Sequence, residues 1–214
     1  MKTMMDAKMK GMVMAAMSAL CLVLGIMGAM GSTWLVPEEE IEGMDSGVGL
    51  TSYWVEMDTA EMGASSEEEC DMMADMMSED GGDAECDGTV LTMSMTFSEQ
   101  CDADEDDEDS CDMATGGMIG TIGMWAGVVC ALLITLTMVL PMAGVDAMDA
   151  VPENVTQIAT WGAGALMLVG MLGWYFMLPD GGDMSLGMSG WMAGAAMSMG
   201  LGSALIGQFI EAEE

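Results

Sequence analysis

Four long stretches without a charged residue constrain this chain more than any other feature. They cover residues 11–37, 113–145, 154–179 and 184–210. Each exceeds the roughly 20 apolar residues that a helix needs to cross a bilayer. Buried core helices are the alternative interpretation, but a chain of 214 residues leaves too few others to build a soluble shell around four of them. The sequence therefore predicts a membrane protein with four transmembrane helices.

The acidic residues are concentrated between the first two apolar stretches. The chain has 36 acids and 3 bases, and 27 of the acids lie between residues 38 and 112. Such a surface repels nucleic acid, whose binding depends on Lys and Arg at the phosphates, and it repels anionic lipid headgroups. It attracts cations or a basic partner. A carboxylate-rich surface that keeps a protein soluble in high salt is the alternative explanation.

The three lysines predict the orientation. Lys2, Lys8 and Lys10 precede the first apolar stretch, and cytoplasmic flanks carry an excess of Lys and Arg. A cleaved signal peptide is the alternative for this stretch, but its apolar run is longer than a signal sequence needs. We expect a multi-pass plasma-membrane protein with cytoplasmic termini 1–10 and 210–214, spans 11–36, 116–143, 155–179 and 185–209, an acidic extracellular domain 37–112, a cytoplasmic loop 144–154 and an extracellular turn 180–184.

Small residues recur at helical spacing in all four stretches. In lipid there is no hydrophobic drive between helices, and small faces let the backbones approach closely. A tight bundle within one chain is the first interpretation, and a homo-oligomer or a complex with another membrane protein through the same faces is the alternative. The glycines expected to mediate helix packing are Gly25, Gly28, Gly116, Gly120, Gly123, Gly127, Gly190 and Gly194.

The helix interiors contain no Asp, Glu, Lys, Arg or His. Coupled transporters place ionisable groups inside the membrane, so this composition argues against them and against most intramembrane enzymes. Since the sequence displays no catalytic constellation, we expect a non-enzymatic protein. The 32 methionines raise copper(I) as a ligand, because thioethers bind soft metals, but flexible core filling in place of Leu is the favoured interpretation.

The acidic segment shows two β-strand patterns. Residues 50–57 and 88–97 alternate apolar and polar side chains, which is typical of half-buried strands. The acidic, Met-rich stretch 65–87 between them indicates a short helix followed by a turn. The predicted fold is an all-α membrane four-helix bundle with a small extracellular β-sheet domain between helices 1 and 2.

Four cysteines are expected to stabilise this small domain by forming two disulfide bonds. They allow three connectivities, and short loop closure favours the pairs Cys70–Cys86 and Cys101–Cys111. Zinc binding is the rival, but the chain has no His and no Cys-x-x-Cys pair.

Seven of the nine residues between Cys101 and Cys111 are carboxylates. The stretch begins like an EF-hand, but it lacks the glycine of the tight turn and the final bidentate Glu. A solvated acidic loop is the first interpretation, a weak calcium site the second, and a binding surface for a basic partner the third. We expect no cofactor other than this calcium ion, whose ligands would be Asp102, Asp104, Asp106, Asp107 and Asp109.

Short motifs accompany this topology: Trp34 follows the first apolar stretch, Gly49-Leu50 precedes Trp54, and Cys101 and Cys111 form a spaced pair. Together with four helices, an inside N-terminus and a large first extracellular segment, these residues resemble the claudin and peripheral-myelin-protein superfamily. Three residues separate Leu50 from Trp54 here, and two further cysteines depart from the family pattern. The resemblance implies an extracellular β-sheet and a role in cell contact or membrane organisation. A cation-binding or channel-accessory membrane protein is the alternative function.

Overall fold

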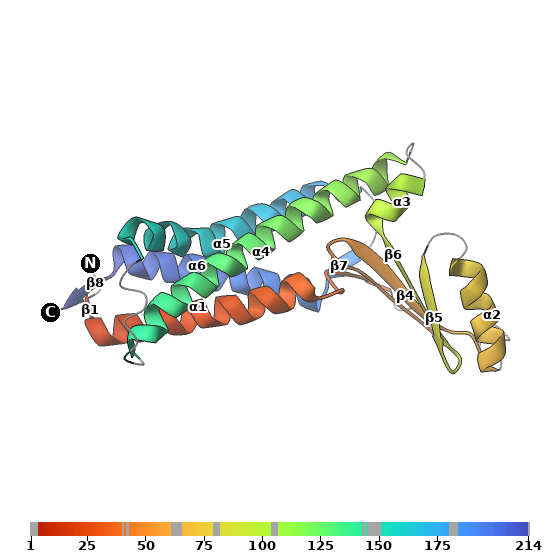
Figure 1. Cartoon of the computed structure of the whole chain (residues 1–214), viewed down its shortest axis with the longest axis horizontal. Coiled ribbons are helices and arrows are strands. Elements are labelled where there is room, and N and C mark those ends of the chain that lie inside the picture. Colours follow the sequence, from red (N-terminus) through yellow and green to blue (C-terminus); the bar gives the residue numbers. More distant parts are fainter. Residues whose placement is uncertain are drawn as a thin grey trace. The chain divides into compact units, whose positions relative to one another are not determined.

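The computed structural model describes residues 4–39, 41, 43–60, 66–78, 82–103, 107–142, 144, 151–179 and 184–213. The chain divides into two compact units (Figure 1). The helical unit comprises Met1–Met30, Gly120–Leu172 and Trp191–Glu214, and the sheet unit comprises Gly31–Ile119 and Gly173–Gly190.

Four long helices dominate the chain: α1 (Ala7–Met30), α4 (Glu108–Met142), α5 (Glu153–Phe176) and α6 (Met188–Phe209). The first three contain segments that are long and apolar enough to cross a membrane, namely Lys8–Met30, Glu108–Pro141 and Glu153–Phe176. The fourth is 22 residues long, but its many glycines and serines lower its hydropathy. Three candidate spans are thus established among the described residues, and the fourth span remains a prediction.

The helical unit buries many small residues, together with Met124, Ile134 and Met167, and leaves many of its large apolar residues exposed. Its buried positions include Ala131, Ala163 and Ala196, which are at most 2% exposed. Val23 and Val169, by contrast, are 53% and 61% exposed. A water-soluble bundle would bury its large side chains. The observed arrangement suits a bilayer, in which small interior faces permit close helix contact and acyl chains cover the outside.

The predicted glycine faces form most of these helix contacts. A Cβ on Gly123 would lie 2.5 Å from Gly170 Cα, and a Cβ on Gly28 would lie 3.0 Å from the Ala193 nitrogen. Gly25, Gly116, Gly120 and Gly127 also lie at close approaches, whereas a Cβ on Gly190 would meet Leu186 and Trp34 and no other helix, so the predicted role of Gly190 in helix packing is not confirmed. The prediction for Gly194 is wrong, because a Cβ there would meet nothing within 4 Å. The α5–α6 contact instead uses Gly164 and Gly200, whose backbones approach each other.

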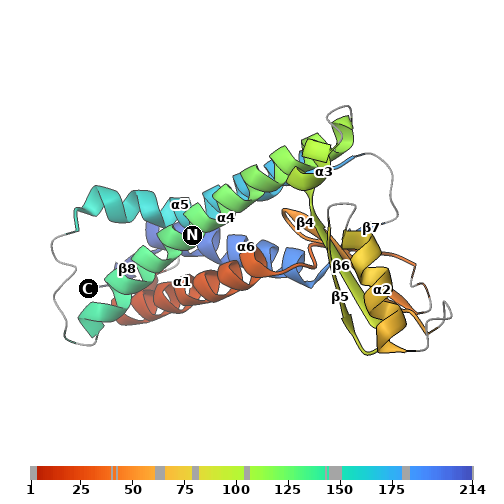
Figure 2. The ribbon, with the colours of Figure 1, turned by 45° about the vertical axis from the view of Figure 1, so that its right-hand side comes forward.

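The short strands β1 (Met4–Asp6) and β8 (Glu211–Glu213) pair in parallel and bring the two ends of the chain together. The views in Figures 1 and 2 place the N-terminus and β8 in the same region of the helical unit.

The sheet unit contains a six-stranded sheet in the order β5-β6-β4-β3-β2-β7. The strands are β2 (Leu35–Pro37), β3 (Met44–Val48), β4 (Ser52–Asp58), β5 (Asp83–Asp87), β6 (Val90–Thr96) and β7 (Met184–Leu186). Helix α2 (Glu67–Ser78) connects β4 to β5, and α3 (Phe97–Ala103) follows β6. The two predicted strands and the predicted short helix correspond to β4, β6 and α2. All strand pairings in this sheet are antiparallel.

Several predicted boundaries are wrong, and three of them reflect a pairing or hydrogen bond with another element. The first helix ends at Met30, so Leu35–Pro37 can pair as β2 with both β3 and β7. The fourth helix begins at Met188, because Met184–Leu186 pairs with β2. The last predicted strand stops at Thr96, and Phe97 begins α3. In each case, residues that the sequence assigned to a continuous apolar or alternating pattern instead form backbone hydrogen bonds with another element.

Methionines fill the core beneath α2. Cys70, Ala74 and Leu91 are buried there, and partly buried Met57, Met73, Met77 and Met93 pack against them. These thioethers cover apolar surface as flexible substitutes for Leu.

Trp34 and Trp174 form an aromatic pair. They are buried against each other in the sheet unit, with ring centroids 5.0 Å apart in a T-shaped contact.

Candidate functional site

The strand register gathers carboxylates on one face of the sheet. Residues opposite each other in antiparallel strands share a face, and successive residues alternate between faces. One face therefore carries Leu91, Met93, Tyr53 and Val55, which belong to the apolar side. The other, here called the acidic face, carries Asp45, Glu56, Asp58, Asp83, Glu85 and Asp87.

One row of the acidic face crosses four strands. Asp45 pairs with Glu56, Glu56 with Thr92, and Thr92 with Glu85. All four side chains are exposed. Like charges directly opposite each other in a sheet are destabilising, and the chain has no base after Lys10 and no His to neutralise them. The row therefore favours binding of a cation or of a basic surface.

The acidic face does not form a ready-made metal cage. Among the described residues, no group of three or more Asp, Glu or Cys side chains could hold a metal ion. Its carboxylates are spread along the sheet, so they suit a distributed electrostatic contact better than a single buried ion.

The Cys70–Cys86 disulfide links α2 to β5, with a Cα–Cα distance of 6.0 Å. It confirms one predicted pair. The link fixes α2 over the apolar side of the sheet, where Cys70 is fully buried. That side is covered near β5, whereas the carboxylates of the acidic face on the outer strands are exposed.

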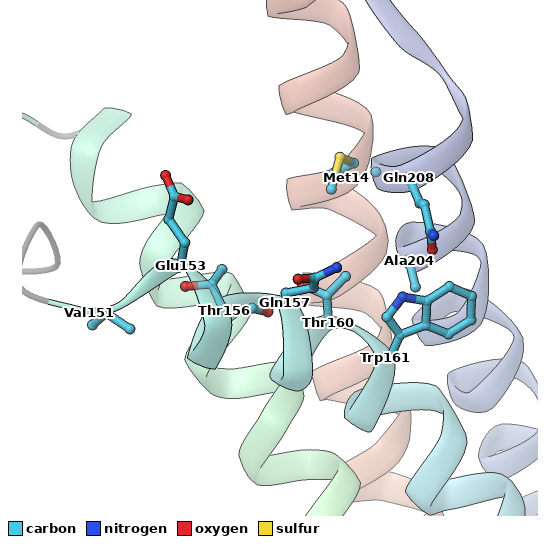
Figure 3. Close-up of a pocket in the computed structure, with 10 residues that line it drawn as sticks. Met14, Val151, Glu153, Thr156, Gln157, Thr160, Trp161, Ala204 and Gln208 are labelled. Atoms are coloured by element: carbon cyan, nitrogen blue, oxygen red, sulfur yellow. Dashed lines mark hydrogen bonds between the residues drawn. The ribbon is translucent and has the colours of Figure 1, made fainter.

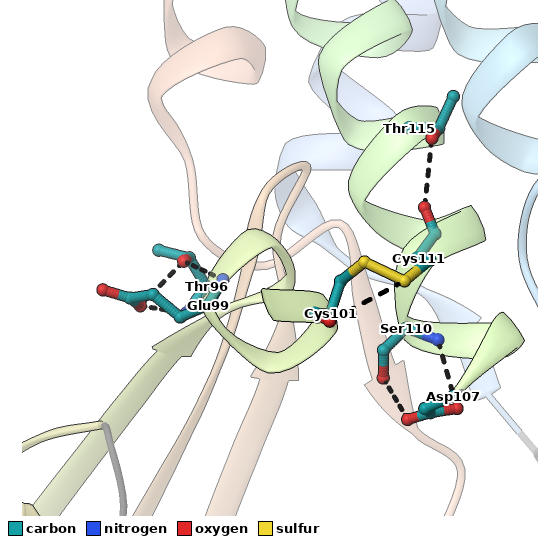
Figure 4. Close-up of a disulfide and its surroundings, with 7 residues drawn as sticks. All are labelled: Thr96, Glu99, Cys101, Asp107, Ser110, Cys111 and Thr115. Atoms are coloured by element: carbon teal, nitrogen blue, oxygen red, sulfur yellow. Dashed lines mark hydrogen bonds between the residues drawn. A yellow bond between two sulfur atoms is a disulfide. The ribbon is translucent and has the colours of Figure 1, made fainter. Parts of the chain in front are cut away.

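The Cys101–Cys111 disulfide confirms the second predicted pair, but the segment that it closes is not a simple loop (Figure 4). Cys101 lies in α3, and Cys111 lies in the first turns of α4. The span predicted to begin at residue 116 thus extends back as a helix to Glu108.

Asp107 explains why α4 starts so early. Its Oδ2 accepts a hydrogen bond from the Ser110 hydroxyl at 2.6 Å, and its Oδ1 accepts one from the Ser110 backbone N–H at 3.5 Å. This is an N-cap, and Glu108 and Asp109 in the first turn complement the helix dipole. The Ser110 hydroxyl holds the pKa of Asp107 below its usual value.

A second cap starts α3. The Thr96 hydroxyl and backbone N–H donate to Glu99 Oε2 at 2.7 and 3.1 Å, and the Glu99 N–H donates to the Thr96 hydroxyl at 3.2 Å. This reciprocal pattern is a capping box, visible in Figure 4. The hydrogen bonds from Thr96 lower the pKa of Glu99.

The residues predicted to bind calcium are placed only in part. Asp107 serves as the helix cap, Asp109 is exposed in the first turn of α4, and Asp102 is exposed in α3. Asp104 and Asp106 lie outside the described residues. The calcium site at this segment remains a prediction.

The four family-motif residues come together. The Trp34 N–H donates to the Val48 carbonyl at 2.8 Å, and Trp54 Nε1 donates to the Ser32 carbonyl at 3.2 Å. Gly49 closes the β3–β4 turn through its N–H to the Ser52 carbonyl at 2.7 Å, and Leu50 is buried beside it. These residues join the segment after α1 to the sheet.

Sequence reasoning missed the acidic face as a site. The alternation Asp83-Ala-Glu85-Cys-Asp87 was a local signal for one of its strands, but only the register aligns that strand with Asp45 and Glu56. Comparison with protein-family models, with curated proteins and with solved structures finds no match to this chain, so its function is argued from its own residues.

Proposed function

We propose that this chain is a non-enzymatic integral membrane protein that acts in cell contact or membrane organisation through its acidic sheet, which lies outside the cell. The plan resembles that of the claudin and peripheral-myelin-protein superfamily. The partner is a basic surface on another protein, or a second acidic face bridged by divalent cations.

The observation that carries the proposal is the segregation of the sheet's two faces. Leu91 and the methionines around it are occupied by the unit's own core, whereas Asp45, Glu56 and Glu85 are exposed in one row. Electrostatic complementarity steers association and selects the partner. A face with carboxylates and no base therefore selects for positive charge.

Vesicle clustering tests this proposal. The purified protein is reconstituted into neutral vesicles, and clustering is followed by light scattering with millimolar calcium or with vesicles that display a lysine-rich peptide. A triple variant of the acidic face, Asp45→Asn, Glu56→Gln and Glu85→Gln, should lose most of the clustering.

A charge-matched control separates the acidic face from net charge. The variant Glu68→Gln, Asp71→Asn and Asp75→Asn removes the same charge from exposed positions of α2. It should cluster like the unmodified protein. Equal loss in both variants, or no clustering of the unmodified protein under either condition, refutes a contact role for the acidic face.

Cation binding without membrane contact is the second candidate function. The observation that favours it is the direct pairing of Asp45 with Glu56, because a bound cation would relieve their repulsion. Extracellular calcium modules bind in the roughly 10⁻⁴–10⁻³ M range. Calorimetric calcium binding that disappears in the triple variant, with no vesicle clustering, would favour this function over the first.

A further inference from the structure

A cavity in the helical unit is a second candidate site. A cavity of about 380 Å³ opens among α1, the first turns of α5 and the last turns of α6. In Figure 3, Thr156, Gln157, Thr160 and Trp161 follow one another along α5, with Gln208 on α6 and Met14 on α1. The volume suits a small ligand or the end of a larger one.

The polar residues around this cavity are unusual for the chain. The sequence has three glutamines, and two of them, Gln157 and Gln208, line the cavity from different helices. Carboxamides are costly beside lipid unless they find hydrogen-bond partners. Both glutamines are exposed, and among the residues that the structure describes no hydrogen bond engages either side-chain amide, so both are available to a ligand.

The remaining lining combines neutral hydrogen-bonding groups with apolar surface. Trp161 offers an indole N–H, and Thr160 donates its hydroxyl proton to the Thr156 carbonyl at 2.7 Å, which leaves the hydroxyl oxygen free to accept. Met14, Val151 and Ala204 supply apolar contacts. The ligand must therefore carry both donor and acceptor groups next to an apolar body.

The charges near the cavity exclude an anionic head group. Glu153 is the charged residue in the lining. Lys10 lies nearby, but its ammonium group donates to the carbonyls of Gly207 and Ile210 at 3.0 and 2.5 Å and so caps α6. Among the described residues, a phosphate at this cavity would meet the Glu153 carboxylate, and the Lys10 ammonium already donates to two carbonyls.

We propose that this cavity binds the uncharged, hydroxyl-bearing end of a membrane amphiphile. Gln157 and Gln208 exchange hydrogen bonds with the hydroxyl group, the Trp161 indole donates to its oxygen, and the apolar body lies against Met14 and Ala204. A sterol and a diacylglycerol share this chemistry, and the binding experiment separates them.

Binding is measured on the full-length protein in detergent micelles, with radiolabelled cholesterol and dioctanoylglycerol as neutral probes and dioctanoyl phosphatidic acid as the anionic comparison. Saturable binding of a neutral probe, in preference to the phosphatidic acid, is expected. The neutral probe that binds identifies the source of the hydroxyl group. Binding of neither neutral probe, or preference for phosphatidic acid, overturns the proposal.

The double variant Gln157→Leu/Gln208→Leu should lower the affinity for the neutral probe by at least about tenfold, because each lost hydrogen bond of about 1 kcal/mol lowers the affinity by roughly a factor of five. Gln100→Leu changes the third glutamine, in the sheet unit, and should leave binding unchanged. Trp161→Phe keeps an aromatic ring but removes the indole N–H, so it should weaken binding while the helical circular dichroism stays unchanged. This single variant tests the site even if the double variant misfolds. Equal affinity in all these variants overturns the proposal.

Discussion

Replacing Gly123 by alanine tests the close packing of α4 on α5. A Cβ at this position would lie 2.5 Å from Gly170 Cα and 2.8 Å from the Leu166 carbonyl oxygen. Carbon atoms in ordinary contact are about 3.5–4.0 Å apart, so the methyl group intrudes by about 1 Å. The atoms that it meets belong to backbone, which cannot rotate away as a flexible side chain could. The helices must therefore separate.

The size of the effect follows from two opposing terms. Overpacking of this kind costs about 1–3 kcal/mol, whereas replacing glycine by alanine within a helix returns up to about 1 kcal/mol. We expect Gly123→Ala to lower the free energy of unfolding by about 1–2 kcal/mol. The matched control is Gly194→Ala on α6, where a Cβ would meet nothing within 4 Å. That variant should be neutral or more stable by up to about 1 kcal/mol.

Reversible unfolding in mixed micelles, titrated with sodium dodecyl sulfate and followed by helical circular dichroism, measures both variants. We expect a clear difference in unfolding free energy between the two variants, with Gly123→Ala the less stable. Equal changes, or a larger loss for Gly194→Ala, would refute the helix contacts described here.

Three further predictions concern the sheet unit. Leu91→Ala should lower the free energy of unfolding of this unit by about 2–5 kcal/mol, because Leu91 is fully buried; urea titration followed by tryptophan fluorescence measures it, and a change below about 1 kcal/mol would contradict the described core. Replacing Cys70 and Cys86 by alanine removes the cross-link of a 16-residue separation and should cost about 3 kcal/mol, with faster proteolysis near α2; unchanged proteolysis would contradict its role in holding that helix. The depressed pKa of Asp107 means that its cap is fully stabilising above the unfolded value near 4 and is lost as the pH falls through the lower folded value. Hydrogen exchange of the first turn of α4 should therefore accelerate at acidic pH in the unmodified protein more than in Asp107→Ala, beyond the intrinsic pH dependence, and identical profiles would contradict the cap.

Local patterns in the sequence predicted much of the sheet unit. Period-two alternation identified β4 and β6, and short loop closure identified both disulfides. Two caps were also readable but were missed. The Thr96-x-x-Glu99 motif starts α3, and Asp107 starts α4. Carboxylates between two cysteines were interpreted as a solvated loop, although an aspartate three residues before a serine can begin a helix.

Pairing between distant segments could not be predicted in the same way. Strands β2 and β7 have three residues each, too few for a periodic pattern, and they come from segments on opposite sides of two long helices in the sequence. Composition identified an acidic domain, but only the register assigns Asp45, Glu56 and Glu85 to one row. Likewise, Gln157 and Gln208 meet at one cavity only because α5 and α6 pack together.

We propose that the acidic sheet lies outside the cell, whereas the connection before α5 lies in the cytoplasm. Glycosylation mapping in a eukaryotic cell tests it with one substitution. Asp87→Asn creates an acceptor sequence with Gly88 and Thr89 in the β5–β6 turn, and the natural Asn154-Val155-Thr156 acceptor is the internal comparison. The account predicts that a glycan is added at position 87 and that Asn154 stays unmodified. A glycan on Asn154, with none at position 87, would contradict it.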